Sequence, residues 1–279
     1  MDRQYFLFLN LISRPIHGGK SMEKKYDVIT AMDLCVDLIV GLGNVLPEFH
    51  QKEQIVKNYH LELGGSCSIF ASQIAKLGLR VAGIGRVGED FLGFFVLNRL
   101  KEMGVITENI QTDPSVKTGL GVALCKEDGD RAILTYPGTI DSVERRDITD
   151  ELLGSTRHIH IGSYYLLKKL QPHYPEILRK AKGFGVTVSL DTNWDPDESW
   201  DGGLENILQY VDIFMPNENE IKLITRKDTV ESAIRALDNT IPVIAVKLGE
   251  KGAIAYANGN EYRVGSLKVD VVDTVGAGD

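Results

Sequence analysis

The stretch that decides the fold is Asp273-Thr274-Val275-Gly276-Ala277-Gly278-Asp279, at the end of the 279-residue sequence. Its central Gly-Ala-Gly carries no bulky side chain, so the backbone amides can turn toward an anion. If a helix began here, its N-terminal amides and dipole would favour negative charge. Asp279 would then lie beside the anion, where a carboxylate can accept a proton from an attacking hydroxyl. The stretch indicates phosphoryl transfer, with a tightly packed and capped helix start as the alternative.

The overall composition is ordinary for a globular protein, with 43% hydrophobic and 25% charged residues. A net charge of −8 provides no basic footprint, so nucleic acid is not expected as a partner. Cys35, Cys67 and Cys125 form no CxxC pair, and we expect free thiols in a reducing cytoplasm. The apolar run at residues 6–12 is too short to span a membrane. Met22 precedes the first predicted strand, so residues 1–21 are interpreted as an N-terminal extension.

Predicted strands and helices alternate along most of the chain, which is typical of a parallel sheet covered on both faces. Dense apolar runs predict buried strands, and the first of them continues toward Asp37. The predicted strands are residues 26–32, 80–84, 158–161, 186–190, 211–215 and 243–247, and the predicted helices are residues 66–77, 91–103, 174–182 and 230–238.

Two alternating runs, residues 119–125 and 131–136, interrupt this order, and Asp128-Gly129 between them is a strong hairpin signal. A hairpin inserted into an α/β pattern predicts a flap that stands off the main sheet. Because no Pro/Gly/Ser linker divides the chain, we expect one α/β domain over residues 22–279, with a small β lid from about 37–63 and 119–136.

Candidate ligand-binding residues surround the predicted strand-to-helix turn Leu63-Gly64-Gly65-Ser66. Glycine lets a ligand approach the backbone closely, although a plain turn explains the pair equally well. Asp37 follows the preceding apolar run, and a carboxylate there could accept hydrogen bonds from two hydroxyl groups of a ligand. Asp33, by contrast, is interpreted as part of a surface turn.

Polar residues also follow two later strands, at the edge of the sheet where ligands collect in α/β proteins. Asp191 and Asn193 follow one of these strands, and Asn217 and Glu220 follow the next. One carboxylate and one amide suffice for Mg²⁺, which keeps several of its waters. A helix N-cap with acids in its first turn explains Asn217 and Glu220 as well, and both interpretations can hold together.

Lys247 ends the last predicted parallel strand, and Gly249 and Gly252 follow it, where a glycine would let the backbone approach a ligand. Lys247 could meet a phosphate, and a solvated lysine is an equal alternative. The GxGxxG pattern at residues 83–88 lacks the full strand-turn-helix context, so we reject NAD binding. No third metal ligand accompanies His158 and His160, which we interpret as structural, and Arg131 is interpreted as a surface residue of the flap.

These motifs, in this order, resemble those of the ribokinase family of sugar and nucleoside kinases, also called PfkB-like, from about Tyr26 to the end. The resemblance implies a ribokinase-like three-layer α/β/α fold with a mainly parallel sheet and a small β lid. It implies an ATP-dependent phosphotransferase that acts on a hydroxyl of a small sugar or sugar acid, with Mg²⁺ and K⁺ as ions. It also implies a cytoplasmic homodimer formed through the lid.

The resemblance assigns a role to each motif. Asp279 is the catalytic base, and Gly276, Ala277 and Gly278 form the anion hole. The substrate-binding residues are Asp37, Gly64, Gly65, Ser66 and Asp191. The nucleotide-binding residues are Asn217, Glu220, Lys247, Gly249 and Gly252; Glu220 acts on Mg²⁺ indirectly, and Asp273 and Val275 bind the monovalent cation.

Two features depart from the family pattern. The family has Asn four residues after the second glycine, where this chain has Ile69, which cannot make the hydrogen bonds of an amide. The family also continues beyond the aspartate at which this chain stops, so we expect a sequence truncated at its C-terminus. A nucleoside kinase of the same fold is the alternative activity. A catalytically silent sugar-binding protein is another, if the chain truly ends at 279.

Overall fold

A nine-stranded sheet forms the centre of the computed structural model, which describes residues 24–128, 130–268 and 278. The strand order is β13-β12-β11-β10-β9-β8-β1-β4-β5. Every neighbouring pair from β11 to β5 is parallel, and β12 and β13 add antiparallel partners at one edge. The strands are β1 Tyr26–Ala31, β4 Val81–Gly88, β5 Ile106–Asp113, β8 Thr156–Ile161, β9 Thr187–Leu190, β10 Ile213–Phe214, β11 Val243–Lys247, β12 Ala253–Ala257 and β13 Asn260–Val264.

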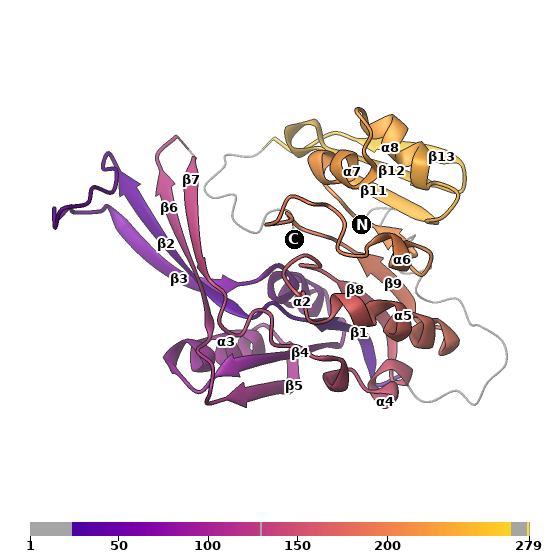
Figure 1. The fold of residues 1–279 in the computed structure, drawn as a ribbon, viewed down its shortest axis with the longest axis horizontal. Coiled ribbons are helices and arrows are strands. Elements are labelled where there is room, and N and C mark those ends of the chain that lie inside the picture. The colour runs from indigo at the N-terminus through magenta and orange to yellow at the C-terminus, as the bar shows by residue number, and fades with distance from the viewer. Residues whose placement is uncertain (1–23, 129, 269–277, 279) are drawn as a thin grey trace.

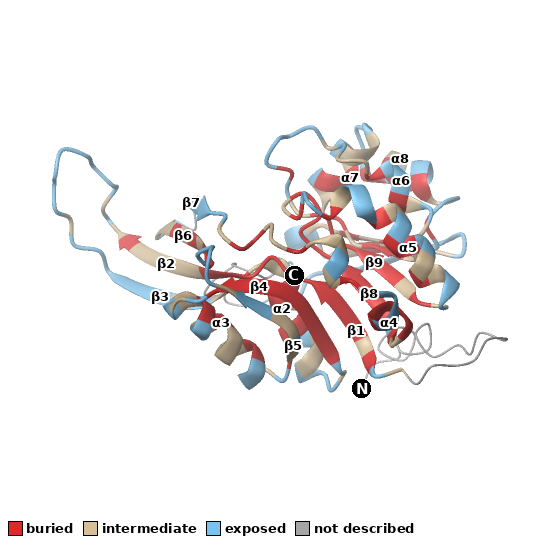
Figure 2. Ribbon diagram, turned by 60° about the horizontal axis from the view of Figure 1, so that its bottom comes forward, coloured by how far each residue is buried: buried red, intermediate tan, exposed pale blue. Residues whose placement is uncertain are grey.

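Helices pack on both faces of this sheet and give the three layers expected from the sequence (Figure 1). Alternate residues of β1 enter opposite clusters because strand side chains point to alternate faces: Val28 packs with α2 and α3, and Ile29 packs with the cluster of α5 and α8. The buried residues concentrate along the sheet (Figure 2). The helices are α2 Ser66–Lys76, α3 Phe91–Glu102, α4 Asp150–Gly154, α5 Tyr174–Gly183, α6 Glu205–Leu208, α7 Glu218–Thr225 and α8 Val230–Leu237, with 3₁₀ turns at Arg145–Asp147, Gln171–His173 and Gly249–Lys251.

A second sheet of four strands, in the order β3-β2-β6-β7, projects from the body of the molecule (Figure 1). We call it the lid sheet; its strands are β2 Cys35–Gly43, β3 Asn58–Gly64, β6 Gly119–Lys126 and β7 Arg131–Tyr136. The pair β2 and β6 is parallel, whereas β3 and β7 pair antiparallel to them. All residues of β7 are exposed, so this edge of the lid sheet has no cover among the described residues.

The sequence predicts most of these elements within one or two residues and misses others for physical reasons. The strand that we expect to run from residue 26 toward Asp37 is two strands in two sheets, separated at Met32-Asp33-Leu34. Strand β5 is missed because its sequence, Ile-Thr-Glu-Asn-Ile-Gln-Thr-Asp, is largely polar, as an edge strand permits. The expected extension at residues 1–21 lies outside the described residues.

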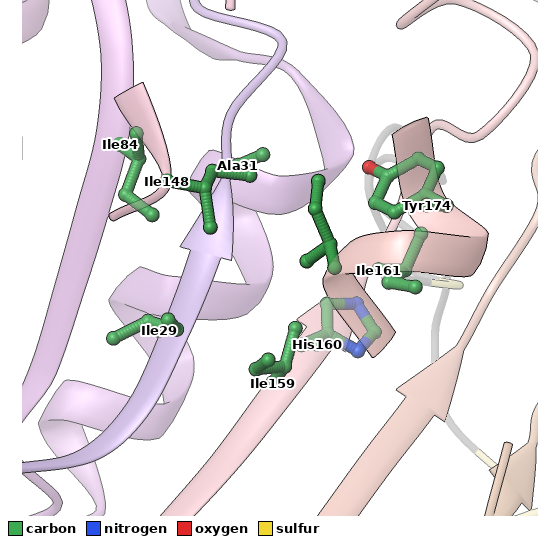
Figure 3. A pocket seen from close by; sticks show the side chains of 9 residues that line it. Ile29, Ala31, Ile84, Ile148, Ile159, His160, Ile161 and Tyr174 are labelled. Carbon is green, nitrogen blue, oxygen red and sulfur yellow. The ribbon is translucent and has the colours of Figure 1, made fainter. Parts of the chain in front are cut away.

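The body also contains a small apolar void of about 10 Å³ between β1, β4, β8 and α5. Isoleucines of the three strands and Tyr174 line it (Figure 3). The void can hold no more than about one water molecule, and its lining is almost wholly apolar. It is therefore a packing defect of the core and not a substrate site.

Candidate active site

A cavity of about 310 Å³ lies where the carboxyl ends of β8, β9 and β11 meet the start of α2. Ligands of α/β proteins bind at this edge of a parallel sheet. The cavity brings together four of the predicted site residues, Ser66, Asp191, Lys247 and Gly278. The other lining residues are Phe70, Gln73, Ile74, His160, Gly162, Met215, Ala245, Val246 and Ala253.

The Lys247 ammonium connects two of these predicted site residues. Its Nζ donates to Asp191 Oδ2 at 2.5 Å and to the Gly278 carbonyl at 3.0 Å. The Lys247 side chain is only 34% exposed, so its charge lies in the cavity wall and not in bulk solvent. This arrangement places a cation between the carboxylate at the end of β9 and the residue before Asp279.

Asp33 is buried at the junction of the two sheets, so its interpretation as part of a surface turn is wrong. Only 3% of the residue is exposed. Its carboxylate accepts hydrogen bonds from the backbone amides of Ser66 and Cys67, at 3.0 and 3.1 Å, and from the Ser163 hydroxyl at 2.5 Å. Burial raises the pKa of this carboxyl above its ordinary value, and the three hydrogen bonds oppose the rise. Asp33 thus caps α2 from a distant part of the chain.

Ser163 and Asn193 extend this network toward the cavity. The Asn193 amide nitrogen donates to Ser66 Oγ at 2.5 Å and to Ser163 Oγ at 3.2 Å. Ser163 and Asn193 both have positive φ, 49° and 59°, a conformation that costs free energy in a non-glycine residue and clusters at functional sites. Ser163 was missed from the sequence, although its place just after β8 is the signal that could have identified it.

Gly64 and Gly65 lie too close to neighbouring residues to carry a side chain, at the place where the chain passes between the two sheets. A Cβ on Gly64 would lie 2.7 Å from the Asp37 carboxylate and from Cys35 Sγ. Gly65 has φ +86°, and a Cβ there would lie 2.2 Å from the Asp33 carbonyl oxygen. Both glycines therefore allow the chain to return from the lid sheet into α2 beside Asp33.

Asp37 lies in the lid sheet, where it pairs in register with Gly121 of β6 and Glu62 of β3. A Cβ on Gly121 would lie 2.4 Å from Asp37 Oδ1, so the small neighbours at Gly64 and Gly121 make room for this carboxylate. Asp37 is half-buried and is not one of the residues that line the cavity. The structure thus separates Asp37 from the group around Lys247.

Asn217 and Glu220 form a capping box at the start of α7. Glu220 is buried, and its two carboxylate oxygens accept from the Asn217 backbone amide at 2.9 Å and from the Asn217 side-chain amide at 2.7 Å. A carboxylate held in this way fits an indirect role toward Mg²⁺ better than direct coordination. Asn217 also pairs with Lys247 in a parallel bridge, which brings the capping box next to β11. Among the described residues, no group of three or more His, Cys, Asp or Glu side chains could hold a metal ion.

The loop after β11 is a 3₁₀ turn that depends on two glycines. Gly249 has φ +58° with open space where a Cβ would lie. Gly252 has φ +91°, and a Cβ there would lie 2.0 Å from the Val264 carbonyl oxygen. The open side of Gly249 leaves its backbone accessible, whereas Gly252 is explained by packing against the chain after β13.

The two histidines of β8 are buried, neutral and hydrogen-bonded, in agreement with a structural role. His158 contacts Thr187 Oγ1 at 2.8 Å and Ser189 Oγ at 2.7 Å, and His160 contacts the same Ser189 hydroxyl at 2.8 Å. Burial lowers the pKa of His158 to about 4 and that of His160 to about 3. His160 also stacks on Phe70 of α2, with ring centroids 3.7 Å apart, in the wall of the cavity.

The glycines at residues 83–88 lie within β4, which is buried throughout, and do not form a phosphate-binding turn. The turn that follows is closed by Asp90, whose carboxylate accepts from the Gly93 amide at 2.7 Å and the Thr118 amide at 2.8 Å. Arg131 lies on the exposed edge of the lid sheet. Within the part of the chain that the structure describes, no helix is both long enough and apolar enough to cross a membrane.

The remaining predicted site residues lie outside the described residues. They are the monovalent-cation residues Asp273 and Val275, the anion-hole residues Gly276 and Ala277, and the base Asp279. Their roles stay predictions from the sequence. Gly278 is the only residue of the 273–279 stretch that the structure describes, and its carbonyl accepts a hydrogen bond from Lys247.

Comparison with known proteins identifies the family of this chain. The model of the pfkB family of carbohydrate kinases matches residues 34–279. A protein named "Probable fructokinase-5" from Arabidopsis thaliana is 29% identical over 257 residues, which cover 87% of this chain and 79% of that protein. The 5-dehydro-2-deoxygluconokinase of Geobacillus kaustophilus is 27% identical over 273 residues, which cover 92% of this chain and 79% of that protein.

Solved structures show the same fold. A candidate Ribokinase II from E. coli, in complex with ATP and Mg²⁺, superimposes with a TM-score of 0.78 at 25% identity, over 91% of this chain and 82% of that one. The ribokinase of Arabidopsis thaliana, in complex with ribose and ATP, has a TM-score of 0.74 at 22% identity, over 92% and 84%. The ribokinase-like fold expected from the sequence is thus confirmed, and the chain belongs to the pfkB family and is a carbohydrate kinase.

Proposed function

We propose that this kinase transfers the γ-phosphoryl group of ATP to a hydroxyl of a small sugar or sugar acid at the cavity described above. The observation that carries the proposal is the position of the Lys247 ammonium, between Asp191 and the Gly278 carbonyl. This cation lies next to the residue that precedes the predicted base, where the transferring phosphoryl group would develop charge. Preorganised charges at such a point are a main source of catalysis in phosphoryl transfer.

The roles proposed for the individual residues are those that the sequence motifs predict. Asp279 removes the proton of the sugar hydroxyl, and the amides of Gly276, Ala277 and Gly278 stabilise the phosphoryl group. Ser66, Gly64, Gly65 and Asp191 hold the sugar from the body, and Asp37 holds it from the lid sheet, while Lys247, Gly249 and Gly252 approach the nucleotide. When bound with ATP, Mg²⁺ would neutralise phosphate charge, and Glu220 and Asn217 would act on it indirectly, through its waters. Asp273 and the Val275 carbonyl would hold a monovalent cation such as K⁺.

Both substrate classes in this proposal have a named relative, since one relative is named for a sugar acid and another for the sugar fructose. Ile69 stands where the family pattern has an asparagine that contacts the sugar. The identity of the substrate therefore cannot be inferred from any single relative. The lid sheet, with its exposed β7 edge, would close over the sugar and exclude water, or join two subunits.

The test is a coupled assay of ADP release with Mg-ATP and a panel of fructose, 5-dehydro-2-deoxygluconate, ribose and adenosine. We expect turnover with a sugar or sugar acid and none with adenosine. Asp279→Asn should lower kcat by about 10²–10⁴-fold, the usual contribution of a positioned base, with little change in sugar affinity. Turnover with adenosine alone would assign the chain to nucleosides, and an unchanged kcat would remove Asp279 from the role of base.

A further inference from the structure

The hydrogen bonds that lead from Asp33 to the cavity all run in one direction. Two backbone amides and the Ser163 hydroxyl donate to the Asp33 carboxylate, which is the environment of an ionised acid. An ionised carboxylate has no proton to give. Ser163 must therefore use its single hydroxyl proton on Asp33, and its oxygen can only accept from any other partner.

The direction of the Ser163 hydrogen bond also fixes the orientation of the Asn193 side-chain amide. Asn193 lies 3.2 Å from Ser163 Oγ and must turn its amide nitrogen toward it, because the carbonyl oxygen would face an oxygen that has no proton left. The second proton of the same amide nitrogen goes to Ser66 Oγ, at 2.5 Å. Ser66 consequently accepts from Asn193 and keeps its own proton.

The hydroxyl proton of Ser66 has no acceptor among residues 24–128, 130–268 and 278, and Ser66 lines the cavity. We propose that Asp33 is a positioning residue which, through Ser163 and Asn193, makes Ser66 a hydrogen-bond donor to a carbonyl or carboxylate oxygen of the sugar substrate. The proposal rests on the function proposed above and narrows its substrate class. A sugar hydroxyl can both donate and accept, so it gains less from a fixed donor than an oxygen that only accepts.

The experiment measures sugar affinity by calorimetry without ATP, on the full chain, with two matched pairs of ligands. The pair 5-dehydro-2-deoxygluconate and 2-deoxygluconate differs only by a carbonyl in place of a hydroxyl. The pair gluconate and glucitol differs by a carboxylate in place of a hydroxymethyl group. We expect wild type to prefer the acceptor-bearing member of at least one pair, and the pair that responds identifies which oxygen Ser66 meets.

Ser66→Ala should reduce that preference about three- to tenfold, the usual value of one hydrogen bond, and Ser66→Thr should restore it because it keeps the hydroxyl. Asp33→Asn should reduce the preference to a similar extent. An amide at this position can donate to Ser163, so the hydrogen bonds through Ser163 and Asn193 to Ser66 no longer have one fixed direction. Ser163→Ala breaks the same chain without touching the carboxylate, and serves if Asp33→Asn does not fold.

Asp27→Asn is the matched control, since Asp27 accepts the backbone amide of Arg80 at 2.9 Å at the other end of β1. It should lower stability and leave the preference at the wild-type value. The proposal is overturned if wild type shows no preference in either pair, if Ser66→Ala leaves the preference unchanged, or if Asp33→Asn and Ser163→Ala both behave like Asp27→Asn. Failure of wild type to bind or phosphorylate any sugar would instead overturn the proposed function itself.

Discussion

Strand β4 of the body and strand β7 of the lid sheet are both rich in apolar residues, yet all eight residues of β4 are buried and all six of β7 are exposed. Ile133, Leu134 and Tyr136 of β7 are 58%, 63% and 50% exposed, whereas Val81, Ala82 and Val87 of β4 have no exposed surface. The difference comes from the layers, because helices cover β4 and no described element covers β7. Apolar content alone therefore does not place a strand in the core, and the lid sheet leaves apolar side chains of β7 exposed.

The largest test of this comparison removes a core side chain from the body. Leu100 of α3 is fully buried, so Leu100→Ala should lower the free energy of unfolding by roughly 2–5 kcal/mol through lost burial and a residual cavity. Leu134→Ala in β7 should change it by less than about 0.5 kcal/mol. Urea unfolding followed by circular dichroism measures both. Equal losses in the two variants would show that β7 is covered in solution.

The second test uses histidines of the two regions, buried His158 in β8 and exposed His60 in β3. The pKa of His158 is lowered to about 4, so the unfolded chain binds a proton near pH 6.5 that the folded chain refuses. Stability from this residue is therefore present above pH 6.5 and lost as the pH falls toward 4, by up to about 3 kcal/mol. The free energy of unfolding, measured between pH 7 and 4, should depend less steeply on pH in His158→Gln than in wild type, with His60→Gln measured as the exposed control. A slope unaffected by His158→Gln would contradict the buried neutral state.

The third test is at the junction of the two regions. Gly65→Ala should cost about 2 kcal/mol, because it combines a positive φ with a Cβ that would lie 2.2 Å from the Asp33 carbonyl oxygen. Gly259 has φ +75° and open space around a Cβ, so Gly259→Ala isolates the backbone cost, about 1 kcal/mol. Thermal unfolding of the two variants gives the difference. Similar losses would mean that the junction can relax around a side chain.

The smallest effect on stability is expected from a charge on the lid sheet. Leu134→Asp should leave unfolding within about 0.5 kcal/mol of wild type. If two chains associate through the lid sheet, the same change should convert dimer to monomer in analytical ultracentrifugation, because it places a carboxylate in an apolar contact. Leu223→Asp on α7, where the leucine is 40% exposed, is the control on the body. Dimers that persist in Leu134→Asp would place the contact elsewhere.

The sequence predicted the parallel sheet and the hairpin of β6 and β7 because dense apolar runs and an Asp-Gly turn are local signals. It could not predict that Asp33 caps α2, since 33 residues separate it from Ser66 and the hydrogen bond exists only once both sheets have formed. Lys247 is a similar case. The sequence left a phosphate ligand and a solvated side chain as equal alternatives, and it could not show that Lys247 pairs with Asp191, which lies 56 residues away. Two interpretations of Asn217 and Glu220 were predicted, and the structure confirms one of them, the helix N-cap with acids in its first turn.

The separation of β1 from β2 at Asp33 has a consequence for how the molecule can vary. The chain leaves the body beside Asp33 and returns at Gly65, and the same aspartate contacts both points. The exposed segment that joins β2 to β3, residues 44–57 with Phe49 and Ile55, can be lengthened, shortened or exchanged while the paired strands and the two anchoring points keep their positions. The tip of the first hairpin of the lid sheet can in this sense be exchanged for that of a related kinase, which would change the exposed surface of the lid sheet and leave the paired strands beneath it intact.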